Sequence, residues 1–156
     1  MNGLVELIFE AVQNGAVKHL VDDLLKGGVV IGSSHSELGV CELNVIDENY
    51  LTSLWEAETA VSVFIRADQI SIGGVLINRP VIRILRYQNS NDVSLIFDSA
   101  DVIESDREEA LRGLAAGAKI LAKNSEVPKF YCGFEPATDE KTRLFCGEVM
   151  GPIRSL

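Results

Sequence analysis

Basic side chains are nearly absent from the first sixty residues, which hold ten acidic side chains and only Lys18 and Lys26 as basic ones. This third of the chain carries −8 of the formal net charge of −9. Carboxylates repel phosphate groups, so the imbalance argues against nucleic acid and against an anionic membrane surface as partners. The same charge attracts a basic protein at long range.

Long apolar runs are missing as well. No window of the sequence approaches the roughly 18 apolar residues that span a bilayer. The beginning of the chain has no basic region, and Glu6 and Glu10 interrupt its apolar run, so no signal peptide is predicted. We therefore expect a cytoplasmic protein.

Cysteine is scarce, with only Cys41, Cys132 and Cys146 present. A count this low does not suggest a disulfide scaffold. Cys132 and Cys146 could lie on neighbouring strands and pair. Buried reduced thiols are the preferred interpretation, because free cysteine packs as a small apolar side chain.

Recognisable catalytic and cofactor motifs are also lacking. The two histidines, His19 and His35, form no metal-ligand pair with each other or with the cysteines. The glycines of residues 27–34 do not have P-loop spacing, and no lysine follows Gly32. We expect no cofactor, no metal and no enzymatic activity.

Hydrophobic periodicity organises the chain as helices, then strands, then a helix and two more strands. Apolar residues recur at helical spacing in residues 4–12 and again in 17–25, where Gly27-Gly28 ends the pattern. Asn14-Gly15 interrupts the spacing, which indicates two short helices or one long helix bent at this pair. Alternation with tight turns predicts strands over the middle of the chain. The expected strands are 29–31, 41–45, 61–65, 70–72, 75–77, 81–87 and 93–97, and a short helix is expected over 47–57.

A long helix is predicted over residues 105–124. Ser105 and Glu108 have the spacing of a capping box, and the acidic-to-basic polarity of the segment suits the helix dipole. Its narrow stripe of alanine and glycine would let the helix lie close to a sheet. Strands follow at 130–132 and 143–146. The fold class is therefore α+β: a single domain over residues 1–156, with a mainly antiparallel meander, N-terminal helices and one long helix packed on the sheet.

The acidic third also contains Trp55, the only tryptophan of the chain. A half-exposed tryptophan ringed by carboxylates suits a hot spot for a basic partner, although a solvated acidic face is the simpler interpretation. The candidate partner-binding residues are Glu42, Asp47, Glu48, Trp55, Glu56, Glu58, Asp22 and Asp23.

In its size, its acidic block from Asp22 to Glu58 and its glycine- and aromatic-rich ending, Phe130–Pro152, the chain resembles the immunity proteins of bacterial contact-dependent and related polymorphic toxins. The resemblance implies a protein that binds a cognate toxin domain, often a basic nuclease, and blocks its active site. Carboxylates would then mimic phosphate charge and speed the encounter.

Two other classes remain open. A small enzyme or ligand-binding domain would place a pocket between the sheet and the 105–124 helix, with His35, Cys41 and Glu135 as candidates. An assembly subunit would expose an apolar patch that self-associates. The oligomeric state is not predictable from the sequence.

Overall fold

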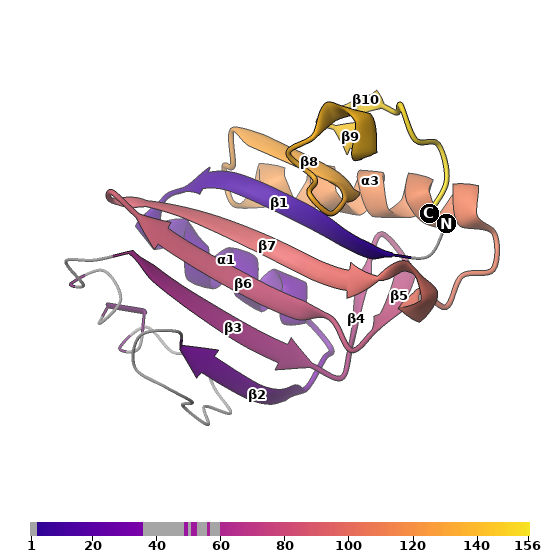
Figure 1. Cartoon of the computed structure of the whole chain (residues 1–156). Coiled ribbons are helices and arrows are strands. Elements are labelled where there is room, and N and C mark those ends of the chain that lie inside the picture. Colours follow the sequence, from indigo (N-terminus) through magenta and orange to yellow (C-terminus); the bar gives the residue numbers. More distant parts are fainter. Residues whose placement is uncertain (1–2, 36–48, 50, 53–55, 57–59) are drawn as a thin grey trace.

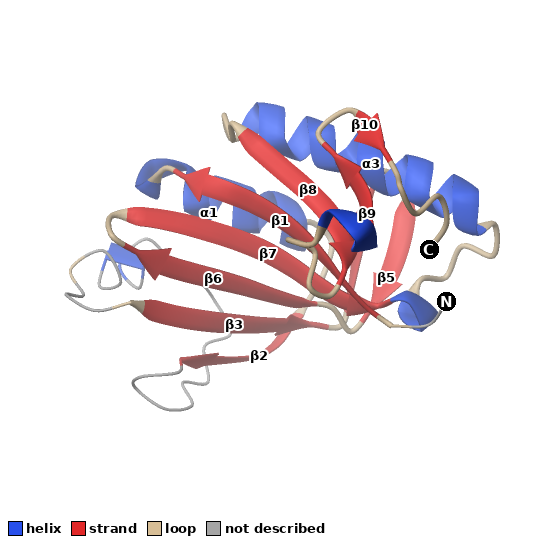
Figure 2. Cartoon of the chain, turned by 45° about the horizontal axis from the view of Figure 1, so that its top comes forward, coloured by secondary structure: helices blue, strands red, loops and turns tan. Residues whose placement is uncertain are grey.

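The two longer α-helices of the described chain pack on the same face of a large antiparallel sheet (Figures 1 and 2). The computed structural model describes residues 3–35, 49, 51–52, 56 and 60–156. The helices are α1 (Asn14–Leu25) and α3 (Arg107–Asn124). None of the helices in these ranges is long and apolar enough to cross a membrane. The predicted α+β class is confirmed.

The main sheet has eight strands. In spatial order they are β10 (Val149–Met150), β9 (Arg143–Cys146), β8 (Lys129–Phe134), β1 (Leu4–Val12), β7 (Ser90–Asp98), β6 (Val81–Tyr87), β3 (Val61–Ala67) and β2 (Val30–His35). A separate hairpin pairs β4 (Gln69–Ile72) with β5 (Val75–Asn78), two of the predicted strands, and turns at Gly73-Gly74.

Residues 4–12 form a strand, so the helix predicted there is wrong. Val5, Leu7 and Phe9 alternate along β1 and pack into the main core beneath the helices. Ile8 points to the opposite face, where Tyr131 and Ala137 cover it. Because β1 lies in the middle of the sheet and is covered there on both faces, apolar residues occur on both sides of it. The resulting spacing imitates a helix.

The second predicted stripe is confirmed as α1. Val17, Leu20, Val21 and Leu24 are buried, and Gly27 takes a positive φ of 79° just past the end of the helix. The helix begins at Asn14, so the Asn14-Gly15 pair opens it instead of breaking it.

The predictions for the segment between β2 and β3 lie almost wholly outside the described residues. This applies to the strand expected at 41–45. Of the helix expected over 47–57, Asn49, Leu51 and Thr52 are described and helical, and Glu56 lies in a turn. Strands β3, β5, β6 and β7 appear close to their predicted positions.

Helix α3 begins one residue later than the capping box predicted. The N-cap is Asp106, whose carboxylate accepts hydrogen bonds from the backbone N–H groups of Glu108 and Glu109. Ser105 therefore lies outside the helix. The small-residue stripe of α3 faces the β4–β5 hairpin, where Gly113 and Gly117 meet the backbone of Gly73.

The last strands appear as predicted, with the short β10 added at the edge. Cys132 is buried and Cys146 is half-buried, and both thiols are free. Cys132 pairs in register with Phe145, whereas Cys146 pairs with Tyr131. Since cross-strand partners share a face, the two thiols point to opposite faces of the sheet, which excludes a disulfide between them.

Candidate functional site

Three of the proposed partner-binding residues lie in the described part of the chain: Asp22, Asp23 and Glu56. Asp22 is exposed on α1 and pairs with Lys18, and the Oδ2 atom of Asp23 lies 3.9 Å from Nδ1 of His19. Glu56 is exposed. Their association with the rest of the acidic set stays a prediction. The other five residues lie outside the described ranges: Glu42, Asp47, Glu48, Trp55 and Glu58.

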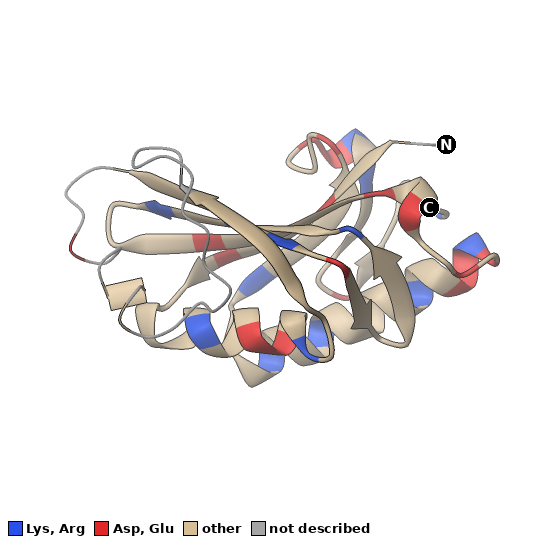
Figure 3. Ribbon diagram, turned by 90° about the horizontal axis from the view of Figure 1, so that it is seen from below, with Lys and Arg blue, Asp and Glu red and all other residues tan. Residues whose placement is uncertain are grey.

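Two further N-terminal carboxylates lie on the opposite side of the sheet from α1. Glu6 and Glu10 project from β1 toward the face that the α-helices leave uncovered, which we call the open face. Glu6 lies 3.8 Å from Arg83, and Glu10 lies 3.4 Å from Lys129. Figure 3 shows acidic and basic positions intermingled over the ribbon. In the described ranges, the N-terminal carboxylates are therefore divided between two sides of the molecule.

Tyr131 forms the centre of a polar cluster on the open face. Its hydroxyl donates a 2.7 Å hydrogen bond to Glu10, and its ring is 2% exposed. Two cations lie over this ring, with Arg143 at 4.7 Å and Lys129 at 5.4 Å from its centroid. Burial, and then the hydrogen bond to Glu10, raise the pKa of Tyr131 above its ordinary value. The neutral phenol is therefore strongly favoured.

The loop between β8 and β9 covers this cluster. The Ala137 N–H donates to Glu6 across 3.5 Å, and Arg143 donates through Nε to the Ala137 carbonyl at 3.2 Å. Ala137 itself is buried against Ile8 and Tyr131. One end of the open face is thus closed by a loop that is tied to the sheet by polar contacts.

Further along the open face, Arg83 and Ser94 occupy paired positions on β6 and β7. Ser94 is 1% exposed, and its Oγ has no hydrogen-bond partner in the described structure. The Nε atom of Arg83 is also buried without a partner. Buried polar atoms are satisfied in most proteins, so two adjacent exceptions mark this part of the face.

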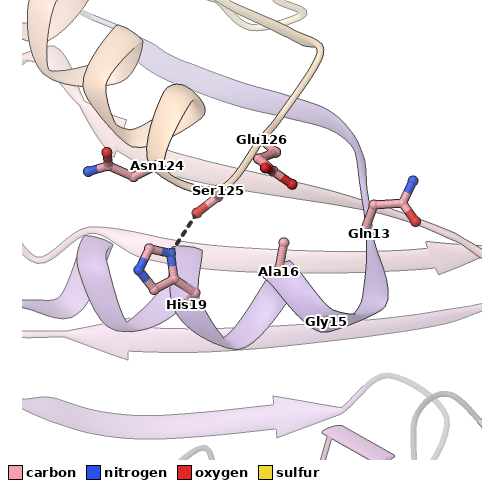
Figure 4. Close-up of a pocket in the computed structure, with 7 residues that line it drawn as sticks. All are labelled: Gln13, Gly15, Ala16, His19, Asn124, Ser125 and Glu126. Carbon is pink, nitrogen blue, oxygen red and sulfur yellow. Dashed lines mark hydrogen bonds between the residues drawn. The ribbon is translucent and has the colours of Figure 1, made fainter.

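A hollow of about 380 Å³ lies where the start of α1 meets the end of α3 (Figure 4). Its lining residues are Gln13, Gly15, Ala16, His19, Asn124, Ser125 and Glu126. His19 Nδ1 lies 3.1 Å from the Ser125 hydroxyl. Asp23 approaches that same ring nitrogen. A hydrolytic triad needs the carboxylate and the hydroxyl on different nitrogens of the ring, so this trio does not have that geometry.

Of the residues expected for an enzyme or ligand-binding domain, only Glu135 has a described side chain, and it does not line this hollow. Cys41 and the side chain of His35 lie outside the described structure, and Glu135 is exposed on the β8–β9 loop. No group of three potential metal ligands occurs among the described residues. At the β4–β5 hairpin, α3 packs through close glycine backbone contacts. A hollow of about 370 Å³ lies between α3 and the last strand of the sheet, lined by Glu108, Leu111, Arg112, Met150 and Arg154, and it contains none of the predicted candidates.

The open-face cluster was not predicted from the sequence. A signal was present, because charged residues stand at alternate positions of two strongly apolar strands: Glu6 and Glu10 in β1, and Arg83 in β6. Had residues 4–12 been interpreted as a strand, the alternation would have placed both glutamates on one face.

A family model and a solved structure match this chain. The chain matches the family described as PABL017 Cdi1I immunity protein over residues 3–150. It also superposes on one chain of a crystal structure of the toxic C-terminal tip of CdiA from Pseudomonas aeruginosa in complex with an immune protein. That match has a TM-score of 0.86 and 23% identity, and it covers 98% of this chain and 99% of the other. No curated protein sequence matches. The family match spans nearly the whole sequence, and the chain therefore belongs to the PABL017 Cdi1I immunity protein family.

Proposed function

We propose that this protein neutralises the toxin domain of a CdiA-type protein by binding to it. The observation that carries the proposal is the family match over residues 3–150. The similar crystal structure supports it, because that structure contains an immune protein with a CdiA toxin tip. Neutralisation of this kind needs no catalytic step, since a bound protein that covers the active site of the toxin stops its reaction. It would take place in the cytoplasm of the cell that makes the protein.

The acidic first third of the chain suggests that the toxin is a basic nuclease. A nuclease binds phosphates and is therefore rich in Lys and Arg at its substrate site. Carboxylates of an inhibitor attract those residues and accelerate association. The proposed contacts are the acidic set with Trp55 as the apolar anchor. The exposed positions of Asp22 and Glu56 are compatible with this role.

Co-expression tests the function directly. The probe is the C-terminal toxin domain of a CdiA-type protein from the same source as this chain. We expect cells that express the toxin domain to survive only when the chain is present, and the purified pair to elute as one complex. Death of the co-expressing cells, with both proteins folded and no complex formed, would exclude the proposed function.

The charge argument has its own test. Replacing Glu56 and Glu58 by Lys changes the formal net charge from −9 to −5. We expect this variant to associate with the toxin roughly tenfold more slowly at low salt. The control, Glu104→Lys with Glu135→Lys, changes the net charge equally at two exposed sites outside the acidic third. Equal slowing by both variants would show a general charge effect and no acidic contact site.

A further inference from the structure

Three polar side chains of the open face are placed together by the strand register. Arg83 on β6 pairs with Ser94 on β7 and with Phe64 on β3. Arg66 is the next residue of β3 on the same face and pairs with Val81. Residues two apart on a strand share a face, so the two arginines are diagonal neighbours across the β3–β6 pair. We call Arg66, Arg83, Ser94 and Phe64 the arginine patch.

The polar groups of this patch lack hydrogen-bond partners inside the described structure. Among the described residues, the one ion-pair partner of Arg83 is Glu6, at 3.8 Å, which is longer than a hydrogen bond. Arg83 Nε and Ser94 Oγ are both buried and unsatisfied. Arg66 is exposed, and no ion pair with another described residue is recorded for it. Leaving such groups unpaired lowers stability, so they favour a ligand that brings the missing acceptor.

The charge of the patch defines that acceptor. On the open face, β3 and β6 carry the two arginines and no carboxylate, since their other residues there are Ser62, Phe64, Val81, Leu85 and Tyr87. A planar guanidinium matches a carboxylate in shape as well as in charge. The half-buried Phe64 stands directly opposite Arg83 and two residues before Arg66 on β3, so it offers an apolar contact beside both arginines. This combination suits a protein side chain that ends in a carboxylate.

We propose that the arginine patch receives an Asp or Glu side chain of the toxin, so that the open face of the sheet is part of the toxin interface. This inference rests on the proposed function. It adds to the acidic contacts a site of opposite sign on this chain. Contacts of both signs fix the orientation of the toxin, because a partner that is only basic would satisfy the carboxylates but not the arginines.

The test compares two charge reversals of equal size. Arg66→Glu places a carboxylate in the patch. Lys123→Glu, the control, makes the same change on an exposed position of α3, which packs on the other face of the sheet. Both proteins are titrated with the purified toxin domain by calorimetry, after circular dichroism and thermal melting have established their folding. We expect Arg66→Glu to weaken binding at least tenfold and Lys123→Glu to change it less than twofold.

Ser94→Ala is an independent second variant. The substitution removes an unsatisfied buried hydroxyl, so the melting temperature should stay the same or rise. Toxin affinity should fall, because the hydroxyl would donate to the incoming carboxylate, and an unchanged affinity would count against the patch. The inference is overturned if Arg66→Glu binds like the unchanged protein, or if Arg66→Glu and Lys123→Glu weaken binding alike. Failure of the unchanged protein to bind the toxin would instead overturn the proposed function itself.

Discussion

The contact between α3 and the β4–β5 hairpin yields a sharp prediction about stability. A Cβ atom added at Gly117 would lie 2.5 Å from Gly73 N, 2.5 Å from Ile72 Cγ2 and 2.9 Å from Gly73 Cα. These distances are about 1 Å shorter than ordinary contacts between such atoms. Two of the obstacles are backbone atoms, which cannot rotate aside, so the helix and the hairpin must separate.

The magnitude follows from two opposing effects. Gly→Ala within a helix gains about 1 kcal/mol from helix propensity. Overpacking of a tight contact costs typically about 1–3 kcal/mol, and a backbone obstacle places Gly117→Ala at the upper end of this range. We therefore expect a net loss of about 2 kcal/mol. For a chain of this size that loss lowers the melting temperature by roughly 4–8 °C.

Gly15→Ala is the matched control. Gly15 also lies in a helix, but nothing approaches its added Cβ within 4 Å. Only the propensity gain applies there, so this variant should melt at the same temperature as the unchanged protein or slightly higher. Both variants are compared by urea unfolding and thermal melting. A Gly117→Ala protein as stable as the Gly15→Ala protein would refute the close packing of α3 on the hairpin.

Three further predictions concern single side chains. Asp106→Ala removes the N-cap of α3 and should lower the free energy of unfolding by about 1 kcal/mol in urea, whereas Ser105→Ala should leave it unchanged. A larger loss in Ser105→Ala than in Asp106→Ala would show that Ser105 is the N-cap. Folding raises the pKa of Tyr131, so the neutral phenol stabilises the folded protein fully at a pH below the unfolded pKa of about 10. This stabilisation is lost as the pH rises above that value. In urea unfolding above pH 10, the stability of Tyr131→Phe should therefore fall less steeply with pH than that of the unchanged protein. Burial raises the pKa of the Cys132 thiol and shields it from reagents. In a variant that carries Cys41→Ser and Cys146→Ser, thiol reagents should therefore label the protein only after it unfolds. Rapid labelling of the folded variant would contradict the buried position of Cys132.

Local patterns in the sequence were sufficient for much of the fold. A clear local pattern marks helices α1 and α3 and the strands from β3 to β7. Each of these elements has one solvent-facing and one buried side, or is bounded by residues typical of turns. β1 fails this condition because both of its faces are covered, and its pattern then fits two periods equally well. The start of α3 was misplaced by one residue, because Ser105 and Asp106 are both good caps and only the backbone path decides between them.

The candidate site was less accessible to sequence reasoning. Charge composition indicated a basic protein partner, and the family match agrees with an immunity protein. The arginine patch could not be predicted, because Arg66, Arg83 and Ser94 belong to three strands whose register no local pattern specifies. Its significance depends on atoms that lack partners, which only a three-dimensional structure reveals.

The central position of β1 has a consequence for how quickly protection can begin. Leu7 aligns with Leu95 on one side and with Cys132 on the other. A ribosome must therefore make most of the polypeptide before its earliest strand finds either neighbour, and contacts this distant in sequence form slowly. Protein that is synthesised only after a toxin arrives would bind it after this delay. Protein that has already folded would bind it without the delay.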